Sequence, residues 1–283
     1  MGKLEELIKH IVLEQLEQNI FRGESKEIGS KRVFGGQVLA QALHAASKTV
    51  DPERTVHSLH AYFILPGDAS SPIVYNVDRT RDGGSFTTRR VNAVQHGKDI
   101  FVMAASFQKS QPGLEHMIPM PNVPDPDALI TDQELAQKFG SAVPEEVHRM
   151  LRQRPIEFKP VEIPDLLSPV KNKPFQHVWL KAKGNIPEDA HKNLNKEILA
   201  YASDYNLLTT AMRPHEVTIR DIQLASLDHA MWFHRDFKVD EWLLYALESP
   251  STSNSRGFTR GNIFTRNGKL VASVAQEGLI RLK

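Results

Sequence analysis

The stretches His60-Ala61-Tyr62-Phe63 and His229-Ala230-Met231-Trp232 decide the fold, because they are two copies of one strand-like segment. The similarity extends outward from both stretches. Two further pairs of segments repeat at nearly the same spacing: residues 85–87 with 257–259, and Gly97-Lys98 with Gly268-Lys269. The offset stays near about 170 residues and drifts by a few, as it does when the loops of duplicated units gain or lose residues. The chain is therefore predicted to contain two copies of one folding unit.

Each copy is predicted to consist of one helix and a set of antiparallel strands. In the first copy the helix covers 34–48, where small residues follow Phe34-Gly35-Gly36-Gln37, as is typical of a buried helix. Strand patterns follow at 57–65, 73–77, 85–95 and 100–108. The second copy predicts a strand at 176–183, a helix at 204–213, and strands at 219–233, 242–248, 256–265 and 270–281. The turns are marked by Asp82-Gly83, His96-Gly97 and Asn267-Gly268.

These elements favour an α+β fold made of two tandem helix-wrapped antiparallel sheets. One helix can lie across one curved sheet, so that both bury their apolar faces. Two such units can also pair their sheets edge to edge, which hides exposed strand edges. An amphipathic helix predicted over 3–19 is expected to cover a sheet edge.

The segment between the two copies differs in composition. Residues 110–174 hold 11 of the 17 prolines, a density that disfavours regular sheet and long helices. Two short helices are expected there, one beginning at the capping box Thr131-Asp132-Gln133-Glu134 and one after Pro144. The predicted domains are an N-terminal unit at 1–110, a connector at 111–174 and a C-terminal unit at 175–283.

Composition and charge exclude several classes of protein. The chain has 35 basic and 34 acidic residues, so it lacks the basic excess of a nucleic-acid binder. Without cysteine it has no disulfide, thiol nucleophile or cysteine–zinc site. No apolar run approaches the ~20 residues that span a bilayer. Because residues 1–6 do not resemble a signal peptide and 281–283 are not a peroxisomal signal, a cytoplasmic protein without membrane insertion is expected.

The common sequence signatures of nucleotide-binding proteins and hydrolases are missing. The chain contains no phosphate-binding loop, no dinucleotide fingerprint and no nucleophile elbow. His215-Glu216 has no second histidine at position 219, and the 12 histidines form no short metal-ligand motif. A directly activated water molecule is therefore the favoured nucleophile if the chain is a hydrolase.

Several motifs resemble those of the acyl-CoA thioesterase II family, the TesB-like double-hotdog enzymes. In the second half they are residues 202–206 (ASDYN), 226–235 (SLDHAMWFHR), 241–245 (EWLLY), 256–258 (RGF) and 274–278 (VAQEG). In the first half they are 34–37 (FGGQ), 57–63 (HSLHAYF) and 83–89 (GGSFTTR). The resemblance covers nearly the whole chain and implies a double hotdog that hydrolyses fatty acyl-CoA, with a role in fatty acid and lipid metabolism.

The resemblance also implies a catalytic trio without a metal or cofactor. The Asp of the family's trio falls on Asp204, its hydroxyl residue on Ser226 and its Gln on Gln276. Many members have threonine at the position of Ser226, and serine keeps the hydroxyl. The corresponding positions of the first copy hold glycine and serine, so one active site per chain is expected. The family also tends to self-associate, which together with unpaired sheet edges suggests a homodimer or homotetramer.

This trio suits an attack of water on a thioester. Asp204 can accept the proton of the water, while Ser226 and Gln276 can hold it by hydrogen bonds. Helix N-termini at Gly35-Gly36 and at Asp204 are expected to stabilise the negative charge on the carbonyl oxygen. Without the resemblance, Asp204 would be interpreted as a helix N-cap, Ser226 as an ordinary strand residue and Gln276 as a solvent-facing one.

Five residues are predicted to contact the substrate: Gly35, Gly36, His57, Arg89 and Arg256. The glycines allow close approach of backbone N–H groups, and arginine suits the phosphates of CoA. The alternative interpretations are a simple helix start for the glycines, a core position for His57 and solvated strand positions for the arginines. His60 and His229 are interpreted as core residues.

Two other functions remain open from the sequence. A non-catalytic protein on the same fold would bind acyl-CoA or an acyl carrier without hydrolysing it. An enoyl-CoA hydratase would pair an Asp or Glu with a His, and no such motif of that family is present. Assays of thiol release from palmitoyl-CoA and of crotonyl-CoA hydration distinguish the three.

Overall fold

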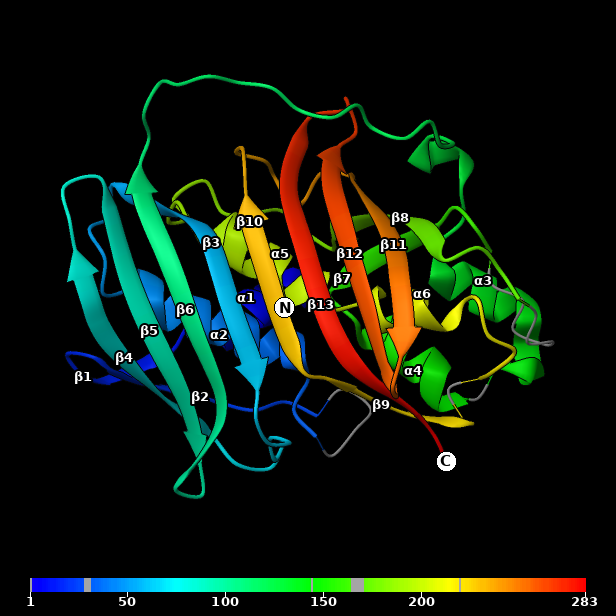
Figure 1. The fold of residues 1–283 in the computed structure, drawn as a ribbon, viewed down its shortest axis with the longest axis horizontal. Coiled ribbons are helices and arrows are strands. Elements are labelled where there is room, and N and C mark those ends of the chain that lie inside the picture. The colour runs from blue at the N-terminus through cyan, green and yellow to red at the C-terminus, as the bar shows by residue number, and fades with distance from the viewer. Residues whose placement is uncertain (1, 28–31, 144, 164–170, 219) are drawn as a thin grey trace.

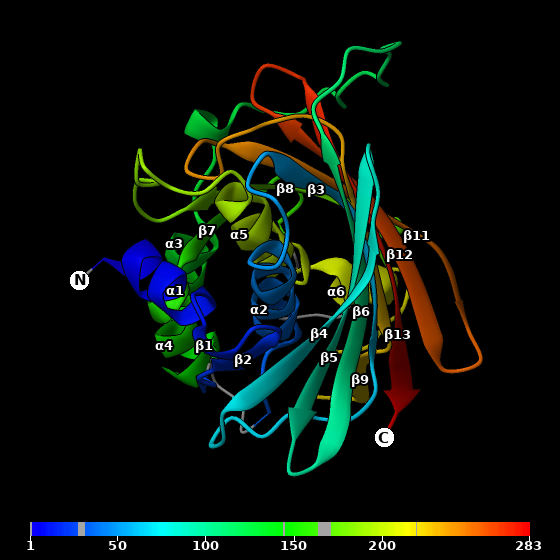
Figure 2. The same ribbon diagram turned by 90° about the vertical axis from the view of Figure 1, so that its left-hand side faces the viewer.

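The computed structural model describes residues 2–283, apart from 28–31, 144, 164–170 and 219. In this part of the chain one 13-stranded antiparallel sheet runs through both halves of the molecule (Figure 1). Its strand order is β1-β2-β4-β5-β6-β3-β10-β13-β12-β11-β8-β7, and β9 pairs with β13. The helices lie on one face of this sheet, as the edge-on view shows (Figure 2).

The first copy of the repeat forms the half of the sheet that ends at β1. Its elements are β1 (Glu14–Glu17), β2 (Ile20–Gly23), α2 (Gly35–Ser47), β3 (Arg54–Phe63), β4 (Ile73–Asp82), β5 (Phe86–Gln95) and β6 (Lys98–Lys109). The predicted helix and strands of this half are confirmed to within a few residues, apart from a longer β4. The turn between β5 and β6 is also confirmed, because His96 and Gly97 have the positive φ angles of 50° and 73° that a two-residue hairpin needs.

Helix α2 is the central helix of the first copy. Residues 36–46 are all buried, which explains why the sequence shows small residues on every side instead of one apolar stripe. The helix packs against the sheet on one side and against α5 on the other (Figure 2). Small side chains allow this double approach, as predicted from the sequence.

The second copy contains a central helix that the sequence analysis missed. Its elements are β8 (Phe175–Ala182), α5 (Leu194–Ser203), α6 (Leu207–Met212), β9 (Ile222–Ser226), β10 (Asp228–Phe233), β11 (Leu243–Ser253), β12 (Arg256–Thr265) and β13 (Leu270–Leu282). The single helix predicted at 204–213 is wrong in its start, because α5 ends before Asp204 and α6 begins after Asn206. Asn206 has a left-handed φ of 69°, which breaks the helix between the two.

The two copies join edge to edge through β3 and β10. His60 lies opposite Ala230 and Leu59 lies opposite Met231, so the two repeated segments that define the duplication form the seam. The edge-to-edge pairing predicted from the sequence is confirmed. It makes one continuous sheet and places α2 and α5 side by side on the same face (Figures 1 and 2).

The N-terminal helix is shorter than predicted. Helix α1 covers Lys3–Ile11, and the chain then forms the hairpin β1–β2 at the edge of the sheet. The predicted helix over 3–19 is therefore wrong beyond Ile11. Leu16 lies in β1 and is half-exposed, so its helical spacing in the sequence does not reflect packing.

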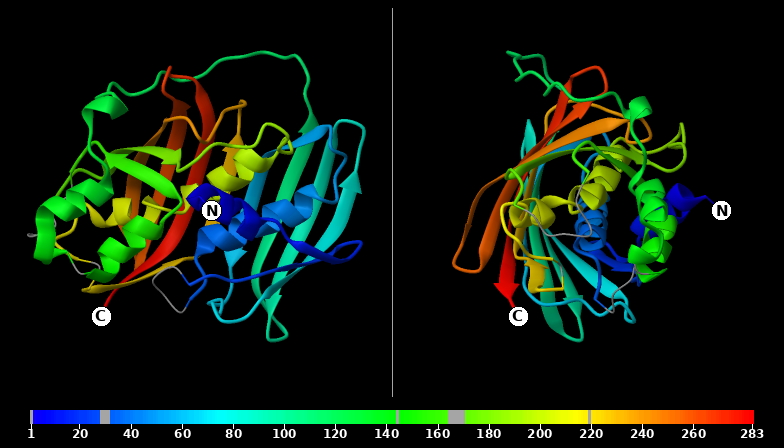
Figure 3. Two further views of the ribbon diagram at one scale, coloured as in Figure 1. Left: turned by 180° about the vertical axis from the view of Figure 1, so that it is seen from behind. Right: turned by 90° about the vertical axis from the view of Figure 1, so that its right-hand side faces the viewer.

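The proline-rich segment runs across the outside of the molecule and then folds over the helices (Figure 1; Figure 3, left). It contains η1 (Pro126–Ala128), α3 (Asp132–Phe139), η2 (Gly140–Ala142), α4 (Glu145–Gln153) and β7 (Ile156–Pro160). The two predicted helices are confirmed, and Thr131 caps α3 through the predicted capping box. The expectation that this segment contributes no sheet is wrong, because β7 pairs with β8. Prolines 155 and 160 stand at the ends of this strand, which lies at the edge of the sheet where proline is tolerated.

In the described residues no helix combines the length and the apolar character needed to cross a bilayer.

Candidate active site

Asp204 lies where the C-terminus of α5 meets the N-terminus of α2. The structure makes Asp204 the residue after the last turn of α5, so the interpretation of Asp204 as an N-cap is wrong. The Gly36 N–H at the start of α2 donates a hydrogen bond to its carboxylate. A β-carbon on Gly35 would come within 2.7 Å of Asp204 Oδ2, and one on Gly36 within 2.3 Å of the Tyr201 carbonyl oxygen. The two glycines therefore allow the ends of the helices to meet.

The structure brings Asp204, Ser226 and Gln276 together from three different elements. Ser226 Oγ donates to Asp204 Oδ1 over 3.4 Å, and Gln276 Nε2 donates to Ser226 Oγ over 2.7 Å. Ser226 ends β9 and lies opposite Gly278 of β13, two residues beyond Gln276. This register explains how two side chains 50 residues apart in the sequence come within hydrogen-bond distance.

His229 extends this set of hydrogen bonds into the interior. Its Nδ1 is 2.7 Å from Gln276 Oε1 and its Nε2 is 3.0 Å from Ser203 Oγ, in a fully buried position. Because the amide nitrogen of Gln276 faces Ser226, its oxygen faces His229, so Nδ1 must carry the proton that it donates. From the sequence, His229 was predicted only to be a core residue. Its position three residues after Ser226 in the same motif was the available signal.

The environment shifts the pKa values of the two ionisable groups in opposite directions. Burial raises the pKa of Asp204, while the charge of a protonated His229 and the hydrogen bonds from Gly36, Gln276 and Ser226 act to lower it. Burial lowers the pKa of His229, which favours the neutral imidazole. Asp204 is thus a stronger base than an exposed aspartate, which suits proton abstraction at neutral pH.

Asp204 and Ser226 line a cavity of about 610 Å³, which is within the range of ligand-binding pockets. Its apolar lining residues include Val33, Phe34, Tyr201, Tyr205, Leu208 and Leu224, and its lysine and arginine residues are Lys3, Lys26, Arg32 and Arg154. The segment around α4 supplies Met150, Gln153 and Arg154 to the lining. This role of the connector was not predicted, because its proline-rich composition carries no signal for it.

Arg154 fixes this segment to the cavity wall. Its guanidinium lies over the ring of Phe158, 4.4 Å from the centroid, and also forms an ion pair with Asp132. The same guanidinium stands 5.4 Å from the centroid of Tyr205, beside Asp204 in the chain. Arg154 therefore ties the connector to the end of α5.

Of the five residues predicted to contact substrate, Gly35 lines the cavity and Gly36 is bonded to Asp204. The other three lie elsewhere. His57 is 2.8 Å from Ser106 Oγ and packs on Phe86. Arg256 forms an ion pair of 2.8 Å with Glu277.

Arg89 departs most clearly from its predicted environment. It is only 1% exposed, so its interpretation as a solvated residue is wrong. Its guanidinium bonds to both Thr49 oxygens, to Asp82 and to the backbone carbonyls of Arg81 and Thr88. This arrangement anchors β5 to the end of α2 and leaves no face toward the cavity.

Two helix-wrapped antiparallel sheets joined edge to edge, with a polar trio at the helix ends, define a double hotdog. A crystal structure of a protein with a hotdog fold from Alicyclobacillus acidocaldarius has a TM-score of 0.79 and covers 98% of both chains. At 17% identity, this likeness concerns the fold alone.

Comparisons with proteins of higher identity give the family. One family model described as acyl-CoA thioesterase matches residues 148–279, and one described as acyl-CoA thioesterase N-terminal domain matches 22–108. Acyl-coenzyme A thioesterase 8 from Homo sapiens is 42% identical, with 96% of this chain and 87% of the relative covered. Acyl-CoA thioesterase 2 from Haemophilus influenzae is 39% identical, with 98% of each covered.

A solved structure agrees with these relatives. The acyl-CoA thioesterase II from Mycobacterium marinum is 45% identical, has a TM-score of 0.81 and covers 98% of both chains. The chain therefore belongs to the acyl-CoA thioesterase family and is a thioester hydrolase.

Proposed function

We propose that the chain hydrolyses fatty acyl-CoA to a free fatty acid and CoA, using a water held by Asp204, Ser226 and Gln276. The observation that carries the proposal is the line of hydrogen bonds from Gln276 through Ser226 to Asp204, which ends at the cavity. The interpretation of these residues as an N-cap, an ordinary strand residue and a solvent-facing residue does not account for their convergence.

In the proposed reaction Asp204 removes a proton from the water as the water oxygen attacks the thioester carbon. The tetrahedral intermediate then collapses with cleavage of the C–S bond. The CoA thiolate takes up the proton that Asp204 removed from the water, which restores the carboxylate, and the acyl group leaves as the carboxylic acid. Asp204 suits the role of base because burial raises its pKa, and because Ser226 lies beside it to orient the water.

The N-terminus of α2 is proposed to stabilise the negative charge on the carbonyl oxygen. This helix has 13 residues, and Phe34 at its N-cap makes no side-chain capping bond. Gly35 lines the cavity and precedes Gly36, whose N–H binds Asp204. A helix start of this kind carries partial positive charge and backbone donors. The second helix start expected at Asp204 is absent, which leaves α2 for this role.

The cavity lining suggests how the two ends of an acyl-CoA are accommodated. Aromatic and aliphatic side chains suit the acyl chain, while Lys3 and Lys26 carry the charge that suits CoA phosphates. Lys26 lies 3.3 Å from Glu6 in an exposed ion pair, which a phosphate can replace at small cost.

The test is a thiol-release assay on acyl-CoA substrates of increasing chain length, with crotonyl-CoA hydration measured in parallel. We expect release of CoA from palmitoyl-CoA and no hydration. Asp204→Asn should lower kcat by about 10³-fold or more, because it removes the base. A folded Asp204→Asn variant with normal kcat would refute the mechanism. Binding without turnover in the wild type would instead favour the non-catalytic alternative.

We further propose that the chain forms a homodimer or homotetramer in the cytoplasm. Support for self-association comes from aromatic side chains exposed on the sheet: Tyr62 and Trp232 on the two seam strands, and Phe86 and Phe258 two strands away on either side. Light scattering coupled to size exclusion measures the oligomer directly, and a monomer at working concentration would contradict this proposal.

A further inference from the structure

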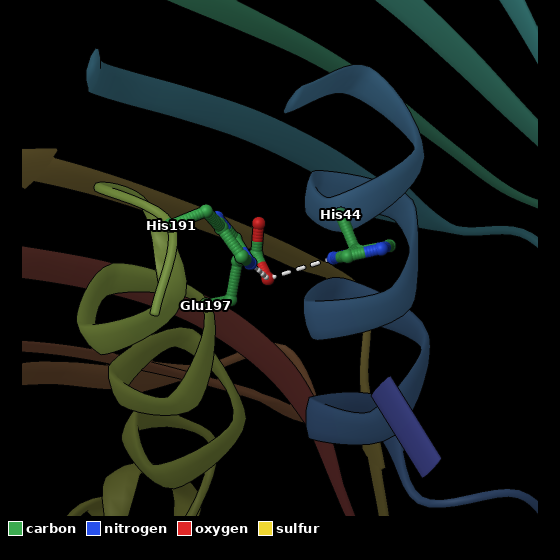
Figure 4. Close-up of side chains that lie close together, drawn as sticks. All are labelled: His44, His191 and Glu197. Atoms are coloured by element: carbon green, nitrogen blue, oxygen red, sulfur yellow. Dashed lines mark hydrogen bonds and ion pairs between the residues drawn. The ribbon is translucent and has the colours of Figure 1, made fainter. Parts of the chain in front are cut away.

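A second cluster of chemically reactive side chains lies at the other end of the α2–α5 contact. Figure 4 shows His44 from α2, Glu197 from α5 and His191 from the segment before α5 directed toward one another. His44 Nδ1 is 3.0 Å and His191 Nε2 is 3.4 Å from the same oxygen, Glu197 Oε2. His44 and Glu197 are 153 positions apart, so this set does not stand out as a short metal-ligand motif in the sequence.

The geometry of the three donor atoms is close to that of a metal site. All three lie within 4.8 Å of one another. Adjacent ligands of a tetrahedral zinc ion with bonds near 2.1 Å stand about 3.4 Å apart. The two distances to Glu197 Oε2, 3.0 and 3.4 Å, already lie close to that value, so mainly the two imidazole nitrogens need to approach each other. His191 can make this movement, because it lies outside the helix and its side chain is 42% exposed.

A buried oxygen without a partner distinguishes this cluster from a simple ion-pair triad. Glu197 is completely buried and both imidazole nitrogens contact its Oε2, whereas among the described residues none donates a hydrogen bond to its Oε1. An unpaired buried carboxylate oxygen carries a substantial desolvation cost. A metal ion bound between the three residues would place a positive charge beside this carboxylate and offset that cost.

We propose that His44, His191 and Glu197 form a binding site for a divalent transition metal ion, with Zn²⁺ as the best fit. Two imidazoles and one carboxylate are a common protein ligand set for zinc, and solvent beside the exposed His191 supplies the remaining position. The ion would sit two helical turns from Asp204, about 10 Å along α5, and so lies outside the proposed catalytic trio. Its role is to clamp α5 to α2.

The test uses the full-length protein stripped of metal with a chelator and then dialysed at pH 7.5. Calorimetric titration with Zn²⁺ measures affinity and stoichiometry, and Co²⁺ gives a visible absorption band whose intensity reports four or five ligands. We expect one ion per chain. At 100 times the dissociation constant, free Zn²⁺ should lower the equilibrium constant for unfolding about 100-fold.

The decisive variant is His191→Gln, because this partly exposed side chain can be replaced without disturbing the core. We expect it to weaken Zn²⁺ binding at least about 100-fold, since even the loss of a group behind a ligand costs 10–100-fold. His44→Gln should do the same. The matched control is His177→Gln, which breaks another histidine–carboxylate pair, with Glu162 at 2.8 Å, but has one imidazole only. Its affinity for Zn²⁺ should equal that of the wild type.

Equal Zn²⁺ affinity in the wild type and in a folded His191→Gln variant would overturn the proposal, as would the absence of stoichiometric binding to the wild type. Circular dichroism of each variant establishes that it is folded. These measurements use no thioester substrate, so the metal site stands or falls independently of the proposed hydrolysis.

Discussion

Two buried carboxylates on the same helical segment, Glu197 and Asp204, are driven in opposite directions by their surroundings. Burial favours the neutral acid at both positions. At Glu197 the charges and hydrogen bonds of His44 and His191 outweigh burial, and its pKa falls to about 2. At Asp204 the opposing contributions are too weak, and its pKa is raised.

The difference shows how one pair of helices holds two carboxylates with different roles, a structural anion at Glu197 and a general base at Asp204. Glu197 is held as a permanent anion between two imidazoles, which suits a structural contact or a metal ligand but not proton transfer at neutral pH. Asp204 receives its hydrogen bonds from neutral donors and keeps its affinity for a proton. The identity of the partners, more than the depth of burial, separates the two roles.

Among changes to the partners of the two carboxylates, the largest expected effect concerns the neutral donors around Asp204, which should act as a unit. Ser226→Ala and Gln276→Ala should each lower kcat by about 10²–10³-fold, because each removes a hydrogen bond that positions the water. The double variant should be little worse than the poorer single variant, since groups that hold one water do not contribute independently. Steady-state thiol release measures all three, and a double variant in which the two losses multiply would contradict the shared site.

The next effect concerns the other carboxylate. Glu197→Gln, measured in the presence of a chelator, should lower the free energy of unfolding by up to about 3 kcal/mol, because it breaks a buried pair. Its kcat should stay within a few-fold of the wild type. Chemical denaturation and thiol release on the same preparation test both parts. A Glu197→Gln variant that loses activity while remaining as stable as the wild type would contradict a structural role for Glu197.

The sequence predicted the architecture well because the two copies of the duplicated unit are still similar in sequence. The repeated strand motifs, the glycine turns and the small-residue helix of the first copy each follow from local chemistry, and the structure confirms them. Helix α5 was missed because Lys196 and Glu197 interrupt its apolar pattern, and both are nevertheless buried. Lys196 is stabilised by the Val56 carbonyl, and Glu197 by His44, contacts that depend on the first copy. No local pattern carries that information.

The site was partly predictable for a similar reason. Family resemblance pointed to Asp204, Ser226 and Gln276, and the structure shows them in contact. The contribution of Arg154 depends on how the connector packs against the cavity, and that of His229 depends on the orientation of the Gln276 amide. Neither feature can be predicted from the local sequence. Arg89 looked like a ligand-binding residue because charge is visible in a sequence, whereas its buried partners are not.

A smaller effect tests the group that supports the trio from behind. His229→Leu should lower kcat about 10-fold to 100-fold, because Gln276 loses the hydrogen bond that fixes the orientation of its amide. His229→Asn keeps an N–H donor near the position of Nδ1 and should recover most of the activity. Both rates are measured by thiol release, with KM expected to change little. Equal losses in the two variants would show that His229 acts through packing and does not orient Gln276.

The smallest effect is a gain in stability from removing the base. The folded-state pKa of Asp204 lies above its unfolded value, so ionisation of this group opposes folding, and the cost is fully present above the folded-state pKa. Asp204→Asn should therefore raise the free energy of unfolding at pH 7 by about 1 kcal/mol, as is common where a functional group is held at a cost. This gain should shrink as the pH falls through the folded-state pKa and vanish below the ordinary value of 3.8, where both states of the wild type are protonated. Over the same range kcat/KM of the wild type should fall, because the base becomes protonated. Denaturation curves recorded between pH 3 and 8 would contradict this account if the stability gain of Asp204→Asn did not change with pH.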